Sequence, residues 1–420
     1  MATEITEAAE VKGETQPLQP LLPGLPDDLA LRCLARLSNI TCAAARATSR
    51  SWRAALSPTT LNAIRVSSDL PSTQLLFLSL SSTDPHSQFQ WFFIDPLRYR
   101  CFPISTPPSS SLSGLISGRA VSKYGQFFLQ LLGEVNDVSC INLLRFSRKP
   151  SSNLSSSIGG SNSSPSAVTI QSGHLKGQEW TYDIVQVPER EQTTATTHLW
   201  STYLGLGRLL FVACGSSAST MAMSFDGEQW KNLPHLNEPR FMAAGLTFKG
   251  QVWVVGGRRV RNSRLEMVES GEVFMPESQK WRLVLGMWPR HLQSLEGVPC
   301  LVAVMGRMFG LKMGSNMIVV WDEDRNAWDC LGLIGEKYVD TGFKGRILGV
   351  EYEKIWAVIE EPFMVFELET SLNIAIKSVS PSEIVIQTRE NIGNLKWRRI
   401  DSELQFGGCE RALECTLIEV

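Results

Sequence analysis

The spacing of apolar side chains separates a short helical stretch near the N-terminus from a long remainder made of strand-like runs. Apolar positions recur every three or four residues from Leu25 onward, and Pro26 followed by two aspartates suits the first turn of a helix. A second helical stretch, 41–56, is rich in alanine and stops before a Ser-Pro pair. The pattern predicts an amphipathic helix of about three turns and a second helix, together a helical domain over 21–60 that follows a disordered leader at 1–20.

The rest of the chain has the pattern of an all-β domain, over 74–420. Short β-branched or aromatic runs alternate with clusters of Gly, Pro, Asn and Asp. The clearest unit, 240–285, has two strand pairs on either side of a long polar loop, with turns at Lys249-Gly250 and at Pro276-Glu277. Residues 107–113 and a serine-rich insert at 149–167 carry too little apolar surface to order themselves, so we expect both to be loops.

A repeat of this unit determines the expected fold. Trp230, Trp281 and Trp328 each follow a strand-like run and recur at spacings of 51 and 47 residues, near the period of roughly 50 residues that kelch repeats show. When the pattern is followed to both ends of the domain, it predicts a mainly β fold, namely a propeller of about six blades. We expect each tryptophan to pack within its blade. The first blade, from residue 74, lacks an innermost strand, and we expect the C-terminal run 415–420 to supply it.

Charge and cysteine content exclude several classes of protein. The 40 Lys and Arg residues nearly balance the 42 Asp and Glu residues, and the net charge of −2 provides no overall field for nucleic acid or an anionic membrane. The nine cysteines form no C-x-x-C pair, which indicates reduced thiols in a cytoplasmic or nuclear protein. No secretory signal pattern and no run of about 18 apolar residues occurs, so a membrane span is not expected.

The helical segment and the repeats together resemble one family. The segment LPDDLALRCLARLSNITCAAARATSRSWRAALSP resembles the F-box, and the units that carry the doublet Gly256-Gly257 and Trp281 resemble kelch repeats. The chain is thus similar to the F-box/kelch-repeat family, a group large in plants, over nearly all of its length after residue 21. The resemblance implies that the F-box binds a Skp-like adaptor, which links it to a cullin in an SCF-type ubiquitin ligase. The kelch propeller would then bind the protein to be ubiquitinated.

The adaptor contact implied by this resemblance lies on apolar residues of the helical segment. They are Leu25, Pro26, Leu29, Leu34, Leu37 and Trp52. About 35 residues of amphipathic helix bury too little apolar surface to be stable alone, which also favours a partner. The alternative is that the helices pack on the propeller with Trp52 as a core residue. Small residues at 43–45, where the family has bulkier ones, predict a weaker adaptor contact.

A second candidate surface is basic. In propellers of this family the loops between the second and third strands, and those between blades, face the substrate. Such loops carry these arginines: Arg240, Arg258, Arg259, Arg261, Arg264 and Arg290. Because guanidinium groups pair with carboxylates or phosphates through two parallel hydrogen bonds, the hypothesis is a basic rim that binds an acidic or phosphorylated segment of the substrate. The alternative is that these arginines are solvated loop charges.

Motifs for catalysis are lacking in the sequence. The five histidines lie far apart without metal-ligand spacing, and no G-x-S-x-G or G-K-[ST] motif stands out. We therefore predict no enzyme activity, no metal and no cofactor. Two alternatives to a ubiquitin-ligase subunit stay open: a non-degradative protein- or ligand-binding kelch module, and a propeller enzyme or carbohydrate binder.

Overall fold

The computed structural model divides the chain into two compact units, Met1–Leu70 and Pro71–Val420. It describes residues 20–37, 39–57, 60–61, 64, 74–81, 89–96, 99–104, 120–123, 126–135, 138–148, 166–169, 179–186, 202–206, 209–213, 220–294, 298–335, 342–350, 354–361, 363–369, 395–404 and 412–419. The expected leader at 1–20 and the expected loop at 107–113 lie outside these residues, apart from residue 20. The serine-rich insert lies outside them up to residue 165. Its last two predicted residues instead begin a strand, because they pair with a neighbouring one.

The described residues of the first unit include the short helices α1 (Asp27–Leu34), α2 (Asn39–Thr48) and α3 (Arg50–Ala55). Two aspartates lie in the first turn of α1, where carboxylates interact favourably with the helix dipole. With 8 residues, α1 is shorter than the three turns predicted. The single helix predicted at 41–56 is wrong, because Ser49 has an extended backbone and its side chain accepts the N–H of Trp52. A serine side chain that caps backbone N–H groups favours a helix start over a helix interior.

The first unit has a small hydrophobic core of its own. Its buried members are Leu34, Ala35, Cys42, Ala45, Leu56 and Leu61. Leu37 and Trp52 pack against this cluster, and the indole N–H of Trp52 donates to the Leu21 carbonyl over 2.8 Å. The tryptophan therefore holds the segment before α1 against α3.

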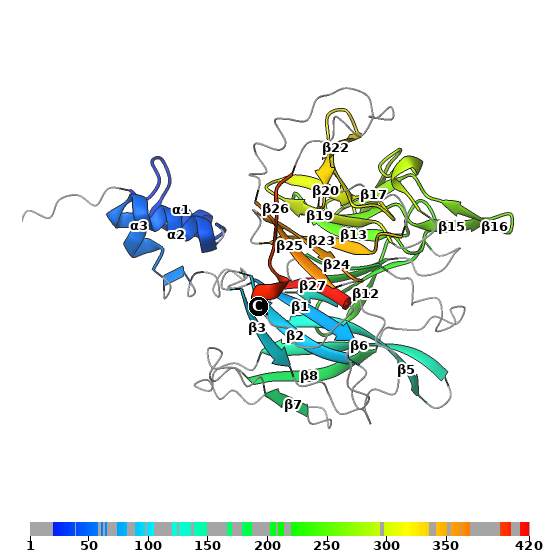
Figure 1. Cartoon of the computed structure of the whole chain (residues 1–420), viewed down its shortest axis with the longest axis horizontal. Helices are drawn as coiled ribbons and strands as arrows, with labels where there is room; N and C mark the ends of the chain where they lie inside the picture. Colours follow the sequence, from blue (N-terminus) through cyan, green and yellow to red (C-terminus); the bar gives the residue numbers. More distant parts are fainter. Residues whose placement is uncertain are drawn as a thin grey trace, which may run out of the picture. The chain divides into compact units, whose positions relative to one another are not determined.

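The second unit is built from antiparallel sheets of similar design (Figure 1). Among the residues that the structure describes, its strands form six sheets of four or five strands and one two-stranded hairpin. In hydrogen-bonded order, the first three sheets are β27 (Ala412–Glu419), β1 (Gln74–Ser81), β2 (Phe89–Asp95) and β3 (Arg100–Ile104); β4 (Ala120–Lys123), β5 (Gln126–Val135), β6 (Val138–Arg148), β8 (Glu179–Gln186) and β7 (Ser166–Thr169); and β9 (Thr202–Leu206), β10 (Leu209–Ala213), β11 (Ala222–Phe225) and β12 (Trp230–Leu233).

The fourth to sixth sheets repeat this pattern and include the unit that is clearest in the sequence. They are β13 (Ala244–Phe248), β14 (Gln251–Val255), β17 (Gly271–Met275) and β18 (Lys280–Val284); β19 (Cys300–Val304), β20 (Arg307–Leu311), β21 (Met317–Asp322) and β22 (Ala327–Leu333); and β23 (Gly345–Val350), β24 (Lys354–Ile359), β25 (Met364–Leu368) and β26 (Trp397–Arg399). A short 3-10 helix, η2 (Arg290–Leu292), follows the fourth sheet, and α7 (Asp401–Leu404) follows the sixth. The unit is therefore mainly β, as predicted.

Consecutive sheets meet through their inner strands, as in a β-propeller. These strands contact one another in the order β27, β4, β9, β13, β19, β23 and again β27. Strand β27 pairs with β1, from Gln74 opposite Glu419 to Leu80 opposite Ala412. The prediction that the C-terminal run adds a strand to the first sheet is thus confirmed, and the pairing covers an edge that would otherwise be open.

Tryptophans near the start of the fourth strands join neighbouring sheets. Each donates its indole N–H to a backbone carbonyl that ends or follows the preceding sheet: Trp281 to Pro234 (2.9 Å), Trp328 to Met287 (2.6 Å) and Trp397 to Leu333 (2.7 Å). Trp281 and Trp328 are only 7% and 2% exposed. The prediction that these two pack within the propeller, and do not form an open stacking platform, is confirmed.

A continuous layer of apolar side chains fills the space between the fourth and fifth sheets. Trp288 is fully buried there and meets Trp328 edge-to-face, with ring centroids 5.0 Å apart. Gly310 in β20 faces this indole so closely that a Cβ would lie 2.9 Å from it. Glycine at this position therefore permits the close packing of the two sheets.

Candidate functional site

Exposed apolar side chains mark two places on the molecule. Among the residues that the structure describes, six large hydrophobic side chains are exposed: Leu25 (39%), Leu29 (43%), Val260 (44%), Leu265 (50%), Leu285 (70%) and Met305 (43%). Four of these form two pairs, one at the start of α1 and one on the two-stranded hairpin. Single exposed apolar residues are ordinary on protein surfaces, whereas apolar patches indicate contacts with a partner.

The first pair, Leu25 and Leu29, lies at the N-terminal end of α1. Leu25 immediately precedes Pro26, the residue that caps α1, and Leu29 lies in the first turn of the helix. Pro26 is exposed as well. Three of the six residues expected to bind the adaptor are therefore exposed at the N-terminal end of α1.

The other three expected adaptor residues lie farther inside the helical unit. Leu34 is 4% exposed and belongs to the core, so in this fold it cannot offer its side chain to a partner. Leu37 and Trp52 are half-buried and pack against the same core. The helical spacing in the sequence grouped Leu34 with Leu29 as expected adaptor contacts. In the structure the core formed with α2 and α3 buries Leu34, whereas Leu29 stays exposed.

The second pair lies on a hairpin where the sequence predicted a long polar loop after Gly256-Gly257. Strands β15 (Arg258–Arg261) and β16 (Arg264–Met267) pair antiparallel and extend away from the sheets (Figure 1). Their turn residues, Asn262 and Ser263, have φ values of 50° and 60°. Positive φ at both positions is the type I′ geometry that closes two-residue hairpins. The loop prediction was wrong because arginine, not a β-branched residue, fills most of β15.

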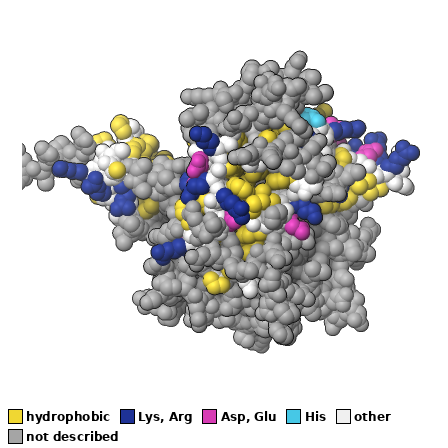
Figure 2. All heavy atoms as spheres, in the orientation of Figure 1, with side chains coloured by type: hydrophobic (Ala, Val, Ile, Leu, Met, Phe, Trp, Pro, Cys, Tyr) yellow, Lys and Arg dark blue, Asp and Glu magenta, His cyan; other side chains and the backbone are white. Residues whose placement is uncertain are grey.

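The register of the hairpin gives it two chemically different faces. Val260 lies opposite Leu265, and Arg261 lies opposite Arg264. Side chains alternate along a strand, and directly opposite residues share a face. One face therefore carries the apolar pair and the other carries the arginine pair. Figure 2 shows basic, acidic and apolar side chains together along this projecting part.

The arginines expected on the basic rim differ in what they already bind. Arg259 pairs with Glu238 and with Glu266, over 3.0 Å in each case. Arg261 and Arg264 are exposed, and neither forms an ion pair with any residue in the described part of the chain. The charges of these two arginines are therefore exposed and not compensated by an ion pair within the described residues.

Two further rim candidates make contacts of their own. Arg258 is half-buried, its guanidinium lies 3.4 Å from the Met242 sulfur, and burial lowers its pKa. Arg290 lies in η2, is 82% exposed and pairs with Glu269 over 2.7 Å. Arg290 remains an accessible charge, whereas Arg258 supports the base of the hairpin.

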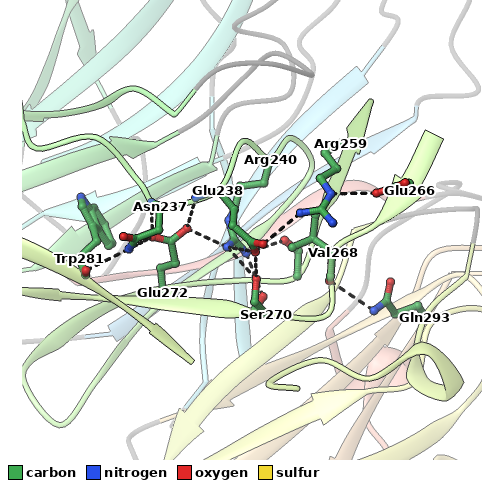
Figure 3. A network of polar contacts seen from close by, with 11 residues as sticks. Asn237, Glu238, Arg240, Arg259, Glu266, Val268, Ser270, Glu272, Trp281 and Gln293 are labelled. Atoms are coloured by element: carbon green, nitrogen blue, oxygen red, sulfur yellow. Dashed lines mark hydrogen bonds and ion pairs between the residues drawn. The ribbon is translucent and has the colours of Figure 1, made fainter. Parts of the chain in front are cut away.

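Arg240, the remaining rim candidate, lies inside the protein (Figure 3). Its guanidinium donates to Glu272 Oε1 over 2.8 Å and to the carbonyls of Gly256 and Ser270 over 3.0 and 2.9 Å. Both Arg240 and Glu272 have fully buried side chains. The expectation of a rim position is therefore wrong for Arg240, which instead ties the glycine doublet to the start of β17.

Two carboxylates complete this network beneath the hairpin. Glu272 accepts the backbone N–H groups of Asn237 and Glu238 over 2.7 and 3.1 Å. Burial favours a higher pKa for Glu238, but the Ser270 hydroxyl and the Arg240 and Arg259 guanidinium groups hold that pKa below its ordinary value. Glu238 is thus an anion that joins the buried pair to the hairpin.

Sequence reasoning missed several members of this site. The apolar pair Val260 and Leu265 and the acidic partners Glu238 and Glu272 were not singled out. The signal available was Asn262-Ser263 between two four-residue runs, which a two-residue turn would connect. No sequence pattern indicated the acidic partners, because the numbers of residues that separate them from Arg240 and Arg259 do not match the repeat of a helix or a strand.

Neither a metal site nor a spanning helix is found in the described part of the chain. No group of three or more His, Cys, Asp or Glu side chains there is placed to hold a metal ion. Among the same residues, no helix is long and apolar enough to cross a bilayer.

Comparison with known proteins bears on both units. The F-box domain model matches residues 22–59, which include all of α1, α2 and α3. F-box/kelch-repeat protein At1g16250 of Arabidopsis thaliana is 24% identical over 325 residues, covering 75% of this chain and 75% of its own. From the same plant, F-box/kelch-repeat protein SKIP30 is 23% identical over 310 residues, 74% of this chain and 65% of its own. Putative F-box/kelch-repeat protein At5g03000 is 26% identical over 125 residues, 28% of this chain and 34% of its own.

Proposed function

Because this chain belongs to the F-box/kelch-repeat family, we propose that it is the substrate-recognition subunit of an SCF-type ubiquitin ligase. A substrate-adaptor role of this general kind follows from the F-box and the kelch relatives. In the proposal, the F-box binds a Skp-like adaptor and through it a cullin, and the propeller binds the protein to be ubiquitinated. Ubiquitin transfer is then performed by other subunits, so this chain acts by proximity and needs no cofactor.

The exposed leucine pair on the F-box is the observation that carries this proposal. Leu25 and Leu29 are accessible although both are large and apolar. Burying each against an adaptor would contribute about 1.5–3 kcal/mol before the costs of association. We propose Leu25, Pro26 and Leu29 as the direct contacts. Leu37 and Trp52 would support them from the edge of the core.

The proposed compartment is the cytoplasm or nucleus. Cys33 on the F-box surface and Cys330 in β22 are free thiols. Free thiols are typical of reducing compartments, where Skp-like adaptors and cullins would be met.

Co-expression with a Skp-like adaptor tests the adaptor role. The Leu25→Asp, Leu29→Asp double variant places two charges in the proposed interface, where they lose their hydration without a partner. We expect a stoichiometric complex with the wild-type chain and none with this variant. The matched control is Leu285→Asp, which introduces a charge at a 70% exposed leucine of the propeller unit and should leave the complex intact.

Folding of each variant is checked by circular dichroism and thermal unfolding. Leu34→Asp is unsuitable as a test, because it would disrupt the core of the helical unit itself. A wild-type chain that fails to copurify with the adaptor, or a double variant that still does, would contradict the proposal. The first result would favour the alternative of an independent, non-degradative binding module.

A further inference from the structure

We propose that Arg261 and Arg264 form an anion-binding pair at the tip of the β15–β16 hairpin. The pair would take the carboxylates or a phosphate group of a short acidic segment in the substrate protein. This inference rests on the proposed function, because it names the class of substrate that the propeller would select.

The first argument is that the arginine pair lacks an internal counter-charge. Arg261 and Arg264 lie directly opposite each other, next to the turn. Like charges in this position destabilise a hairpin, and their Cβ atoms are about 4.5–5.5 Å apart. No carboxylate within the described residues forms an ion pair with either of them. Two arginine side chains whose Cβ atoms are this close can bring their guanidinium groups together on one phosphate or on two adjacent carboxylates.

The second argument is that the hairpin is held in place before a ligand arrives. Arg258 and Phe241 exchange two backbone hydrogen bonds of 2.8 Å, and the Val268 N–H donates to the Gly257 carbonyl over 2.9 Å. Arg259 adds the ion pair with Glu238, which leads to the buried network (Figure 3). A site that is ordered in advance binds with a smaller loss of conformational entropy.

The acidic groups near the base of the hairpin limit the length of the anion. Glu238 and Glu266 both pair with Arg259, next along the same face from Arg261 and Arg264. A long polyanion such as nucleic acid would approach these carboxylates and be repelled, and the net charge of −2 offers no compensating field. A segment with one or two negative groups can bind the arginine pair without approaching these carboxylates.

The reverse face of the hairpin adds an apolar contact. Val260 and Leu265 are 44% and 50% exposed and lie opposite each other. The hairpin is only two strands wide, so a segment that crosses its edge can reach both faces. The preferred segment therefore combines one or two acidic groups with an aliphatic or aromatic side chain.

An unbiased peptide selection on the full chain tests this inference. The probe is a phage-displayed library of random twelve-residue peptides, selected on the wild-type chain in complex with the adaptor. We expect enrichment of peptides with Asp or Glu near an apolar residue. Synthetic copies of these peptides should bind the Arg261→Gln, Arg264→Gln variant at least about tenfold more weakly, since a single charge-assisted hydrogen bond contributes that much.

Matched variants separate a specific site from general charge. The control is Arg282→Gln, Arg307→Gln, which removes two other exposed arginines of the propeller and should bind the selected peptides like the wild type. Copies with phosphoserine in place of the acidic residues show which source of anion the pair prefers. Tighter binding identifies a phosphorylated segment, and weaker binding identifies a carboxylate segment; either result supports an anion site.

Three results would overturn the inference: no selected peptides, selected peptides without acidic residues, or acidic peptides that bind the Arg261→Gln, Arg264→Gln variant as tightly as the wild type. Copurification with the adaptor reports separately on the proposed function. The hairpin variant should retain the adaptor, because its changes lie in the propeller unit. Loss of peptide binding with the adaptor retained therefore concerns the hairpin alone.

Discussion

The hydroxyl of Tyr99 donates a 2.6 Å hydrogen bond to Oε2 of Glu367, across 268 residues of sequence. Tyr99 lies between β2 and β3 of the first sheet, and Glu367 lies in β25 of the sixth. The same carboxylate accepts from Lys354 and from the indole of Trp356, each over 3.0 Å. The Tyr99 ring stacks on Trp356 with centroids 6.0 Å apart. These contacts hold the two end sheets of the propeller unit together.

Replacing Tyr99 by Phe should destabilise the propeller. The ring keeps its stacking on Trp356, but the buried Glu367 carboxylate loses one donor. A hydrogen bond to a charged group contributes about 1.5–3 kcal/mol, and we expect a loss of that size in the free energy of unfolding. Urea unfolding followed by tryptophan fluorescence measures it. In a Glu367→Gln background the same replacement should cost clearly less, and equal costs in both backgrounds would show that the bond contributes nothing.

The stability that Glu367 provides should depend on pH. Burial raises its pKa, but hydrogen bonds from Tyr99, Lys354 and Trp356 and the charge of Lys354 outweigh burial, so the folded-state pKa lies below the ordinary value of 4.5. The unfolded chain therefore binds this proton more readily, and the contribution is complete above the unfolded pKa and is lost as pH falls through the lower folded pKa.

We expect the stability gap between the wild type and Glu367→Gln to be constant above about pH 5 and to shrink as the pH falls further. Urea unfolding at a series of pH values between about 7 and 3 measures the gap. A gap that widens on acidification would mean that the folded-state pKa of Glu367 is raised.

Replacing only one member of the buried ion pair Arg240–Glu272 should strongly lower the free energy of unfolding. Arg240→Met leaves a fully buried carboxylate without its counter-charge, and such changes cost about 3–5 kcal/mol. Adding Glu272→Gln removes that charge and keeps one oxygen, which can still accept one of the two backbone N–H groups, so the double variant should be more stable than Arg240→Met alone. Thermal and urea unfolding compare the two. The control is Arg290→Met, which removes an ion pair whose arginine side chain is 82% exposed. It should change the free energy of unfolding little.

The glycine that precedes the hairpin should be essential, unlike a turn glycine of the same blade. Gly257 has φ of 92°, and an added Cβ would lie 2.7 Å from the Phe241 carbonyl oxygen. Gly250 also has positive φ, 71°, but nothing lies within 4 Å. Gly250→Ala should therefore cost only about 1–2 kcal/mol of backbone strain. Gly257→Ala should cost more and should break the Phe241–Arg258 pairing.

Hydrogen exchange measured by mass spectrometry separates these two outcomes. Faster exchange over 258–267 is expected for Gly257→Ala and not for Gly250→Ala. If both variants exchange alike in this segment, the close approach of Gly257 to Phe241 does not anchor the hairpin.

Local sequence pattern determined the classes of element and their repeat. Apolar spacing indicated helices near Leu29, and the recurring tryptophans indicated repeated β units, because backbone sterics and side-chain period act within a few residues. The turn at Lys249-Gly250 was predicted on the same grounds, and both residues have positive φ in the structure. The C-terminal strand was predicted because an unpaired sheet edge needs a partner.

Tertiary structure alone decided which members of each pattern stay exposed. Leu29 and Leu34 look alike in the sequence, yet the core formed with α2 and α3 buries only Leu34. Arg240 and Arg261 both looked like rim charges, but Glu272, 32 residues from Arg240, draws that arginine inside. Burial of a charge depends on partners brought from other strands, and no local period of the sequence encodes those distances.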